Sequence, residues 1–241
     1  MPAATTTHFA ATRSDSIGVP LPGMELKLVP SATTPESKPD TAYELLVRGP
    51  NVTPGFYGRP ELHAEAFDAE GFLRTGDLVS FVDKHDPNQG LVFGGRIAEN
   101  FKLSTGTFVH VGTLRPKLLS ASAGLLQDAV ICGHDREFVA ALVWLHPDHL
   151  HRVNSDGMPE DGLRAELADC LRRLAASGAG SSQRVDRVLV LTDPPALDAG
   201  EITDKGYVNQ RAVRENRADL VAELTAAVPS PRSVSPATAT C

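Results

Sequence analysis

Residues 74–78 read RTGDL, and residues 94–106 read GGRIAENFKLSTG. The two blocks close a stretch, residues 17–96, in which short β-forming runs alternate with Pro, Gly, Asn and Asp. The runs are MELKLV, YELLVRG, LVSFV and LVFGG. This alternation predicts a small β-rich lobe over residues 1–96.

Beyond Arg96 the apolar runs become longer and helical spacing appears. Two runs, DAVICG and FVAALVWL, are typical of buried strands, and RVLVL predicts a third. One helical face carries Leu163, Leu167, Cys170, Leu171 and Leu174, and a last helix is expected from about Tyr207 with Val213, Leu220, Val221 and Leu224 on one stripe. The pattern predicts a compact α/β unit over residues 97–226, so the fold class is α/β (α+β). Residues 227–241, rich in Pro and Ser, are expected to be a disordered tail.

Composition narrows the classes of partner. The chain has 241 residues, 41% of them hydrophobic, and a net charge of −7 with Lys and Arg scattered, which argues against nucleic acid or an anionic membrane as partner. No apolar run approaches the roughly 20 residues of a membrane-spanning helix. Cys132, Cys170 and Cys241 lack CxxC spacing, so reduced thiols and a cytoplasmic location are expected. Pro147 interrupts the histidines of HPDHLH, and we expect no metal site.

Four segments carry a specific resemblance. They are GVPLPGMELKLV, ELLVRGPNVTPGFYGRPELHAEAFDAEGFLRTGDL, GGRIAENFKLSTG and EITDKGYVNQRAV. In this order they resemble the back half of adenylate-forming (AMP-binding) acyl-CoA synthetases, and the blocks ENFKLSTG and EITDKGYVNQRAV are most similar to feruloyl-CoA synthetases. The resemblance covers residues 17–224. It implies the β-rich end of a large N-terminal domain followed by a mobile C-terminal α/β domain.

The resemblance also implies a reaction. An aromatic carboxylic acid is activated with ATP and Mg²⁺ as an acyl-adenylate, and the acyl group then passes to the thiol of CoA. Asp77 matches the carboxylate that accepts hydrogen bonds from both ribose hydroxyls, and Arg96 matches a residue that holds the ribose or phosphate end of the nucleotide. Without the other blocks, Asp77 could equally cap a tight turn and Arg96 could be a solvated surface residue.

The segment after Arg96 matches the hinge and the channel region of the family. Many members have a charged hinge residue two positions beyond the arginine, where this chain has Ala98, so Ala98 is a pivot candidate only. Lys102 matches a position that turns toward the adenylate or the CoA channel. Ser104, Thr105 and Gly106 could let the backbone approach the pantetheine arm. A solvated Lys102 is the alternative.

Lys205, in GEITDKGY, matches the late lysine that bridges carboxylate and phosphate oxygens during adenylation. An ammonium group there would offset the negative charge that builds in the transition state, and we expect Lys205 to be the catalytic residue. The alternative is a surface ion pair with Asp204, which would contribute about 0–1 kcal/mol.

One expected feature is missing from these residues. No Gly/Ser/Thr-rich phosphate loop of the SGTTGxPK kind precedes RTGDL. We therefore expect the isolated chain to be an inactive fragment of an ATP-dependent acid:CoA ligase. The alternative is a non-catalytic remnant or interaction module, or one half of a split enzyme whose N-terminal half is a separate partner chain.

Overall fold

A computed structural model describes the chain except residues 1–2, 11–12, 14, 32–41, 178–179 and 237–241. The chain divides into two compact units, residues 1–98 and 99–241, and each is described on its own. The sequence predicts this border two residues earlier, after Arg96. Among the described residues, no helix is both long and apolar enough to span a bilayer.

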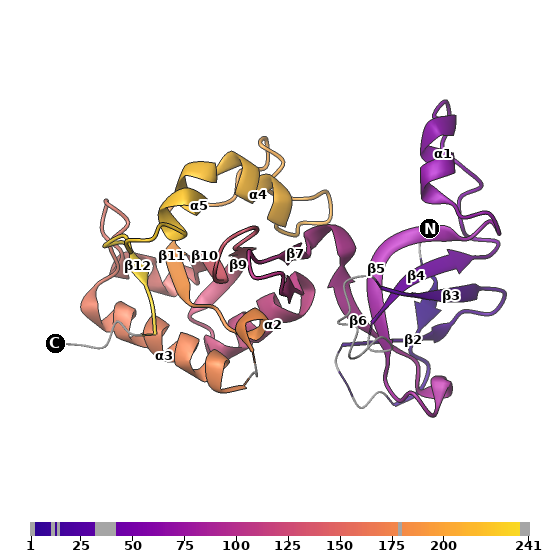
Figure 1. The fold of residues 1–241 in the computed structure, drawn as a ribbon, viewed down its shortest axis with the longest axis horizontal. Coiled ribbons are helices and arrows are strands. Elements are labelled where there is room, and N and C mark those ends of the chain that lie inside the picture. Colours follow the sequence, from indigo (N-terminus) through magenta and orange to yellow (C-terminus); the bar gives the residue numbers. More distant parts are fainter. Residues whose placement is uncertain (1–2, 11–12, 14, 32–41, 178–179, 237–241) are drawn as a thin grey trace. The chain divides into compact units, whose positions relative to one another are not determined.

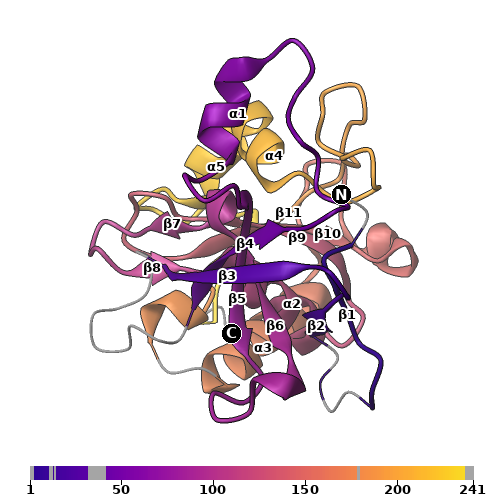
Figure 2. The same ribbon diagram turned by 90° about the vertical axis from the view of Figure 1, so that its right-hand side faces the viewer.

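Unit 1 is built around one antiparallel sheet with the strand order β1-β2-β6-β5-β4-β3. Its strands are β1 (Thr5–Thr6), β2 (Ser16–Pro20), β3 (Glu25–Pro30), β4 (Tyr43–Arg48), β5 (Leu73–Phe81) and β6 (Leu91–Arg96). Its helical segments are α1 (Pro60–Ala66), η1 (Pro87–Gln89) and η2 (Ile97–Glu99), the last of which reaches the border. The strands lie side by side in Figures 1 and 2, and α1 projects beyond the sheet in both views.

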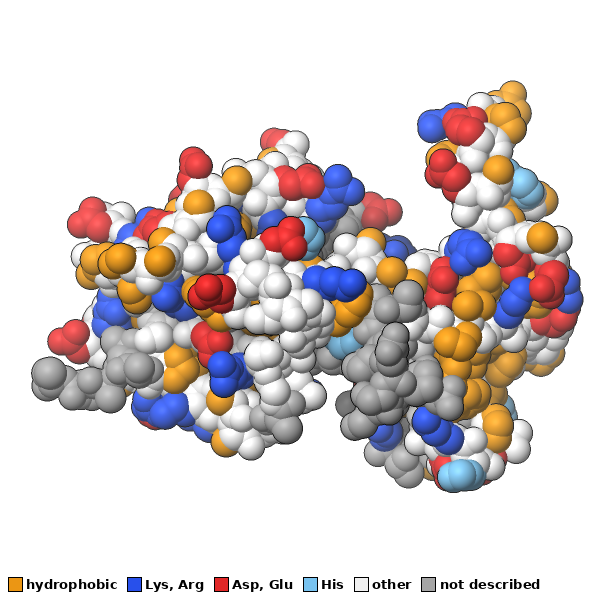
Figure 3. Space-filling view, viewed as in Figure 1, with side chains coloured by type: hydrophobic (Ala, Val, Ile, Leu, Met, Phe, Trp, Pro, Cys, Tyr) orange, Lys and Arg blue, Asp and Glu red, His pale blue; other side chains and the backbone are white. Residues whose placement is uncertain are grey.

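The hydrophobic core of unit 1 is small. Leu45 and Val47 of β4 belong to one core cluster with Val79 of the adjacent strand β5 and Leu91 of β6. Many other apolar side chains of the sheet are only partly buried, and hydrophobic side chains gather on its surface in Figure 3. Phe56, Phe93 and especially Tyr57 are exposed. The β-rich lobe is therefore confirmed, and it leaves considerable apolar surface in contact with water.

Unit 2 is a sheet covered by helices. Its main sheet has the order β12-β11-β10-β9, in which β10 and β11 are parallel and the other pairs antiparallel. The elements are β7 (Phe101–Lys102), β8 (Phe108–Val109), α2 (Val111–Ala121), β9 (Leu126–Cys132), β10 (Ala140–Leu145), η3 (Pro147–Arg152), α3 (Asp161–Ser177), η4 (Ser181–Gln183), β11 (Arg187–Val190), α4 (Gln210–Asn216), α5 (Ala218–Leu224) and β12 (Ser233–Val234).

The two faces of this sheet bury different helices. Ile131 of β9 belongs to the core cluster that contains α2 and α3, whereas Val130 belongs to the cluster that contains α4 and α5. Figure 1 shows the two helix pairs on opposite sides of the strands. Because both faces are covered, the central strands are continuous apolar runs. The five residues predicted to form one face of α3 are all buried, which confirms that helix.

Two expectations for the C-terminus need correction. The expected last helix is two helices, α4 and α5. The backbone leaves helical geometry between them at Arg217, with φ −110° and ψ 37°. The expected disordered tail is also wrong for residues 227–236. There Ser233 and Val234 form β12 beside β11, Val234 is fully buried, and Arg164 donates to the Ser233 carbonyl at 3.1 Å. Residues 237–241 lie outside the described part.

Candidate functional site

The RTGDL segment forms a bulge in β5. Arg74 is opposite Leu46 of β4 and Leu78 is opposite Glu44, so Thr75, Gly76 and Asp77 together face the single residue Leu45. Gly76 has φ +72°, a left-handed conformation that glycine adopts without a steric penalty. A bulge of this kind changes the direction of the side chains within it, which here include Asp77.

The hydroxyl of Thr75 holds the bulge together. It donates a hydrogen bond to the Leu45 carbonyl at 2.7 Å and accepts one from the Asp77 amide at 3.1 Å. The backbone of Asp77 is thereby fixed from within its own segment and from the neighbouring strand. This role of Thr75 was not predicted from the sequence, although a Thr two residues before an Asp, with a Gly between them, is a recognisable local hydrogen-bonding pattern.

A second bulge, in β6, sets the position of Arg96. Leu78 is opposite Gly95 and Val79 is opposite Phe93, so Gly94 is the extra residue. A Cβ atom on Gly94 would lie 3.2 Å from the Leu78 carbonyl oxygen, and Gly95 has φ +100°. The two glycines therefore allow a close approach of the strands just before Arg96.

These two bulges bring Asp77 and Arg96 together. The residues are direct partners across β5 and β6, and Arg96 Nε lies 3.4 Å from Asp77 Oδ1. The Asp77 side chain is 26% exposed, although its Oδ1 atom is buried, and the Arg96 side chain is 58% exposed. Such an exposed pair contributes little to stability. What it offers is a carboxylate that accepts hydrogen bonds next to a guanidinium that donates them.

The hinge candidate and the channel candidates follow in sequence. Ala98 is exposed within η2 and is the last residue of unit 1. In unit 2, β7 and β8 form a short hairpin whose tip carries Ser104, Thr105 and Gly106, all exposed.

Lys102 lies in β7, where its ammonium group is 4.6 Å from the centre of the Phe108 ring. Its carbonyl accepts a hydrogen bond from the Asp135 amide at 3.0 Å, and Ser104 donates to the Arg136 carbonyl at 2.9 Å. The hairpin is therefore held by the loop between β9 and β10. The structure groups Lys102 with the three tip residues.

Lys205 lies at the tip of a second hairpin in unit 2. Ile202 and Val208 form the β-bridge at its base, and Thr203 donates to the Tyr207 carbonyl at 2.8 Å. Asp204, Lys205 and Gly206 form the exposed turn. Among the described residues, no ion pair links Lys205 to Asp204, so the surface-pair alternative has no support in this geometry.

The two lysine-bearing hairpins are anchored on opposite faces of the sheet in unit 2. Phe101 and Leu103, on either side of Lys102, belong to the core cluster with α2 and α3. Val208, after Lys205, packs against the other cluster, which contains residues of α4 and α5. Each lysine is thus presented by a different surface of the same rigid unit.

A buried ion pair near Lys205 was not predicted from the sequence. Glu201, at the start of the hairpin, is paired with Arg217 at 2.7 Å, and their side chains are only 3% and 13% exposed. The Arg217 hydrogen bonds hold the pKa of Glu201 below its usual range. A signal was available, since Arg217 interrupts the apolar stripe of Val213, Leu220 and Leu224 at a position that faces the core.

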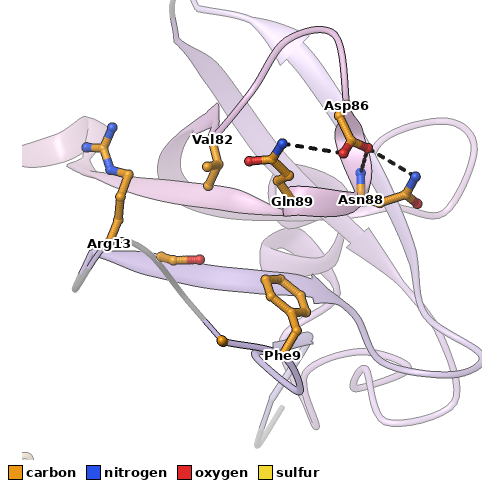
Figure 4. A pocket seen from close by; sticks show the side chains of 8 residues that line it. Phe9, Arg13, Val82, Asp86, Asn88 and Gln89 are labelled. Atoms are coloured by element: carbon orange, nitrogen blue, oxygen red, sulfur yellow. Dashed lines mark hydrogen bonds between the residues drawn. The ribbon is translucent and has the colours of Figure 1, made fainter.

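A hollow elsewhere in unit 1 has a different character. It has a volume of about 250 Å³, and Figure 4 shows its lining side chains Phe9, Arg13, Val82, Asp86, Asn88 and Gln89. The Asp86 carboxylate accepts bonds from the Asn88 amide at 3.1 Å and from the Gln89 side chain at 3.4 Å, so it caps η1. Arg13 is bonded to Asp15 at 2.7 Å. These polar side chains of the hollow are therefore already hydrogen-bonded to nearby residues of the chain.

The part of the chain that the structure describes holds no group of three or more His, Cys, Asp or Glu side chains that could bind a metal ion.

The chain is similar in sequence to known proteins. A carboxylic acid reductase of Mycobacterium marinum is 29% identical over 189 residues, which cover 78% of this chain and 15% of the relative. A salicyl-AMP ligase / salicyl-S-ArCP synthetase of Mycobacterium tuberculosis is 29% identical over 197 residues, or 81% of this chain and 32% of the relative. No protein-family profile matches the chain.

The fold agrees with these relatives. The A domain of the carboxylic acid reductase from Segniliparus rugosus, in complex with AMP and a co-purified carboxylic acid, superposes with a TM-score of 0.66 at 26% identity. The match covers 88% of this chain and 32% of that domain, so the chain spans about a third of its structural relative. By sequence and by fold, the chain is homologous to part of the adenylate-forming (AMP-binding) enzymes, which include carboxylic acid reductase A domains and acid ligases.

Proposed function

We propose that this chain carries the ribose-holding and lysine-bearing parts of an ATP-dependent acid:CoA ligase. The observation that carries the proposal is the pairing of Asp77 with Arg96 on two neighbouring strands that are each bulged next to these residues. An ionised carboxylate only accepts hydrogen bonds, which suits the two vicinal hydroxyls of a ribose, and the guanidinium fork suits ribose or phosphate oxygens. By itself the 241-residue polypeptide is expected not to complete the reaction.

The proposed chemistry has two steps. A substrate carboxylate oxygen attacks the α-phosphorus of ATP, the bond to the β-phosphate oxygen breaks, and pyrophosphate leaves. The CoA thiol then loses its proton to water, its sulfur attacks the acyl carbon, and AMP leaves with the electron pair of the acyl–oxygen bond. In the first step Asp77 and Arg96 hold the nucleotide, while the Lys205 ammonium offsets charge that builds on the reacting oxygens. Mg²⁺ would enter bound to the triphosphate, whose charge it neutralises.

The anchoring of two lysines on opposite faces suits a two-step reaction. We assign Lys205 to adenylation, and Lys102 with Ser104, Thr105 and Gly106 to the thioester step, in which the small turn admits the pantetheine arm. Ala98, an exposed residue at the border of the two units, is the proposed pivot. Rotation of unit 2 about it would bring first the Lys205 hairpin and then the Lys102 hairpin to the reacting groups. The Ala98 side chain is uncharged, so the rotation would not have to break an ion pair made by this residue.

The proposed acid is an aromatic carboxylic acid of the hydroxycinnamate type, with ferulate as the expected member. The similarity of ENFKLSTG and EITDKGYVNQRAV to feruloyl-CoA synthetases supports this choice. A relative named for the activation of salicyl groups also supports an aromatic acid.

A hybrid enzyme tests the proposal. The chain replaces the homologous third of the Segniliparus rugosus A domain, and acid-dependent exchange of pyrophosphate into ATP is measured. We expect exchange, and a loss of about 10²–10³-fold with Lys205→Ala, because one charge-stabilising group is removed. Lys117→Ala, at an exposed position of α2, is the matched control and should leave exchange unchanged. A folded hybrid whose exchange does not depend on Lys205 would overturn the catalytic assignment.

The exposed apolar surface of unit 1 favours a second candidate, in which the chain is one half of a split enzyme. Phe56, Tyr57 and Phe93 are exposed on this small unit, a feature of surfaces that pack against a partner. Mixing the chain with the remaining two thirds of the same A domain, as separate polypeptides, tests this. Recovery of pyrophosphate exchange supports the split form, and exchange only in the covalent hybrid contradicts it.

A further inference from the structure

Glu201 joins the two flanks of the segment that carries Lys205. The Glu201 carbonyl accepts a hydrogen bond from the Asn209 amide at 2.8 Å, and its amide donates to the Ala196 carbonyl at 3.0 Å. Its carboxylate accepts a bond from the Ala196 amide at 2.8 Å. Both flanks of the segment, before and after Lys205, therefore meet at Glu201.

Arg217 connects this base to the body of unit 2. Its guanidinium donates to both Glu201 carboxylate oxygens, at 3.0 and 2.7 Å, and to the carbonyls of Asp193 and Pro194 at 3.1 and 2.9 Å. The same group lies 5.4 Å from the centre of the Trp144 ring, and the Trp144 indole N–H donates to the Asp193 carbonyl at 2.8 Å. Trp144 is on the buried strand β10, so the segment is tied to the central sheet.

A second contact fixes the far end of the segment. Gln210, at the start of α4, donates to the Ala129 carbonyl at 2.8 Å and accepts from the Ile131 amide at 3.0 Å, and both partners are on β9. The exposed tip with Lys205 thus projects from a base that is bonded to two strands. The direction of the lysine is set by this base, because the turn itself is exposed.

We propose that Glu201 and Arg217 are positioning residues that hold the Lys205 hairpin in its working orientation. The proposal rests on the function proposed above for Lys205. An arginine is required because its fork reaches carboxylate and carbonyl oxygens at once, which a lysine ammonium on a flexible stem does not do. Loss of either partner leaves the other charge buried without compensation, and the segment would then open.

The full chain gives a direct test that needs no catalysis. Trypsin cleavage after Lys205 is followed by mass spectrometry, and fluorescence of Trp144, the single tryptophan, reports the anchor. Glu201→Gln and Arg217→Lys should each speed this cleavage at least about tenfold, because the cleavable open form becomes more populated. They should also shift the Trp144 emission. Cleavage at the wild-type rate in both variants would overturn the proposal.

A matched control lies on the same helix pair. Arg211 and Glu215 form an exposed i,i+4 ion pair on α4, at 2.7 Å. Arg211→Lys and Glu215→Gln change the same residue types without touching the anchor, and they should leave both the cleavage after Lys205 and the Trp144 emission unchanged.

The hybrid enzyme separates positioning from a general structural role. Glu201→Gln should lower kcat for pyrophosphate exchange while KM for ATP stays the same, and it should have no further effect when Lys205→Ala is already present. Equal losses of kcat in both backgrounds would show that Glu201 does not act through Lys205. If the wild-type hybrid is folded but inactive, the proposed function fails, and the cleavage rates alone then decide whether Glu201 and Arg217 hold the hairpin.

Discussion

Asp77 and Arg96 are direct partners on neighbouring antiparallel strands, with Arg96 Nε 3.4 Å from Asp77 Oδ1. Each follows a glycine with positive φ, Gly76 in one strand and Gly95 in the other. Two bulges facing each other thus place opposite charges side by side on an exposed surface. The backbone conformation, more than the ion pair, defines the proposed ribose site.

This conclusion predicts a specific effect of Gly76→Ala. The new methyl group would meet no atom within 4 Å, so the cost is conformational strain at φ +72°, about 1–2 kcal/mol of unfolding free energy. Gly71→Ala is a matched control, because Gly71 has φ +79° and equally open surroundings. Both variants should lose similar stability in urea denaturation followed by circular dichroism. Only Gly76→Ala should weaken AMP binding, and equal weakening by both would contradict the role of the bulge.

Acid should destabilise unit 1 through Asp68. Its carboxylate accepts bonds from Lys27 at 2.8 Å and from the amides of Phe72 and Glu70 at 2.9 and 3.0 Å, and these lower its pKa from 3.8 to about 2. Because the folded-state pKa is depressed, the contribution is complete above about pH 4 and is lost as the pH falls toward 2.

Denaturation midpoints measured across this pH range check the Asp68 prediction. Asp68→Asn should flatten the dependence of stability on pH, since the titrating group is gone. Glu65→Gln, at an exposed position of α1, should leave the dependence as it is in the wild type. An unchanged pH profile in Asp68→Asn would contradict the assignment.

The two described cysteines should be inert to thiol reagents. Cys132 and Cys170 are 0% and 1% exposed. Burial raises the pKa of Cys132 to about 12 and also raises that of Cys170, so neither provides thiolate at neutral pH. In a Cys241→Ser background, reaction with an aromatic disulfide reagent should follow global unfolding. Rapid labelling of either thiol in the folded chain would contradict the packing of the sheet in unit 2.

The 241-residue polypeptide should not make feruloyl-CoA on its own. Asp77, Arg96 and Lys205 serve the ribose and the reacting oxygens, and these residues include no phosphate loop for the β- and γ-phosphates. Incubation with ATP, Mg²⁺, ferulate and CoA, analysed by chromatography, should give no thioester. Thioester formation that disappears with Lys205→Ala would show that the chain is a sufficient catalyst and would contradict this expectation.

Much of the fold could be predicted because the signals are local. The apolar runs DAVICG and FVAALVWL identified β9 and β10, and the spacing of apolar residues identified α3. The sequence analysis missed α2, since Pro116 lies inside it and removes a backbone donor that a helix normally uses. It also joined α4 to α5. The break at Arg217 depends on bonds to Glu201, Asp193 and Pro194, which are distant in sequence.

The candidate site was predictable in its residue types but not in its geometry. The resemblance identified Asp77, Arg96 and Lys205 as candidates, but the pairing of the first two depends on the register shifts at Leu45 and Gly94, which no periodicity reveals. The prediction of a disordered tail failed for a related reason. A composition rich in Pro and Ser predicted disorder, yet one buried valine, Val234, and a short pairing with β11 are enough to order part of it.

Titration of the full chain with AMP, followed by amide chemical shifts, tests the central claim most directly. We expect shifts concentrated at residues 75–78 and 94–96, and binding at least about tenfold weaker in Asp77→Asn because a charge-assisted hydrogen bond is lost. Glu65→Gln is the control and should bind as the wild type does. AMP lacking both ribose hydroxyls should bind wild type and Asp77→Asn equally weakly. Shifts confined to the hollow around Phe9 and Gln89, or equal AMP binding by wild type and Asp77→Asn, would contradict a ribose site at Asp77.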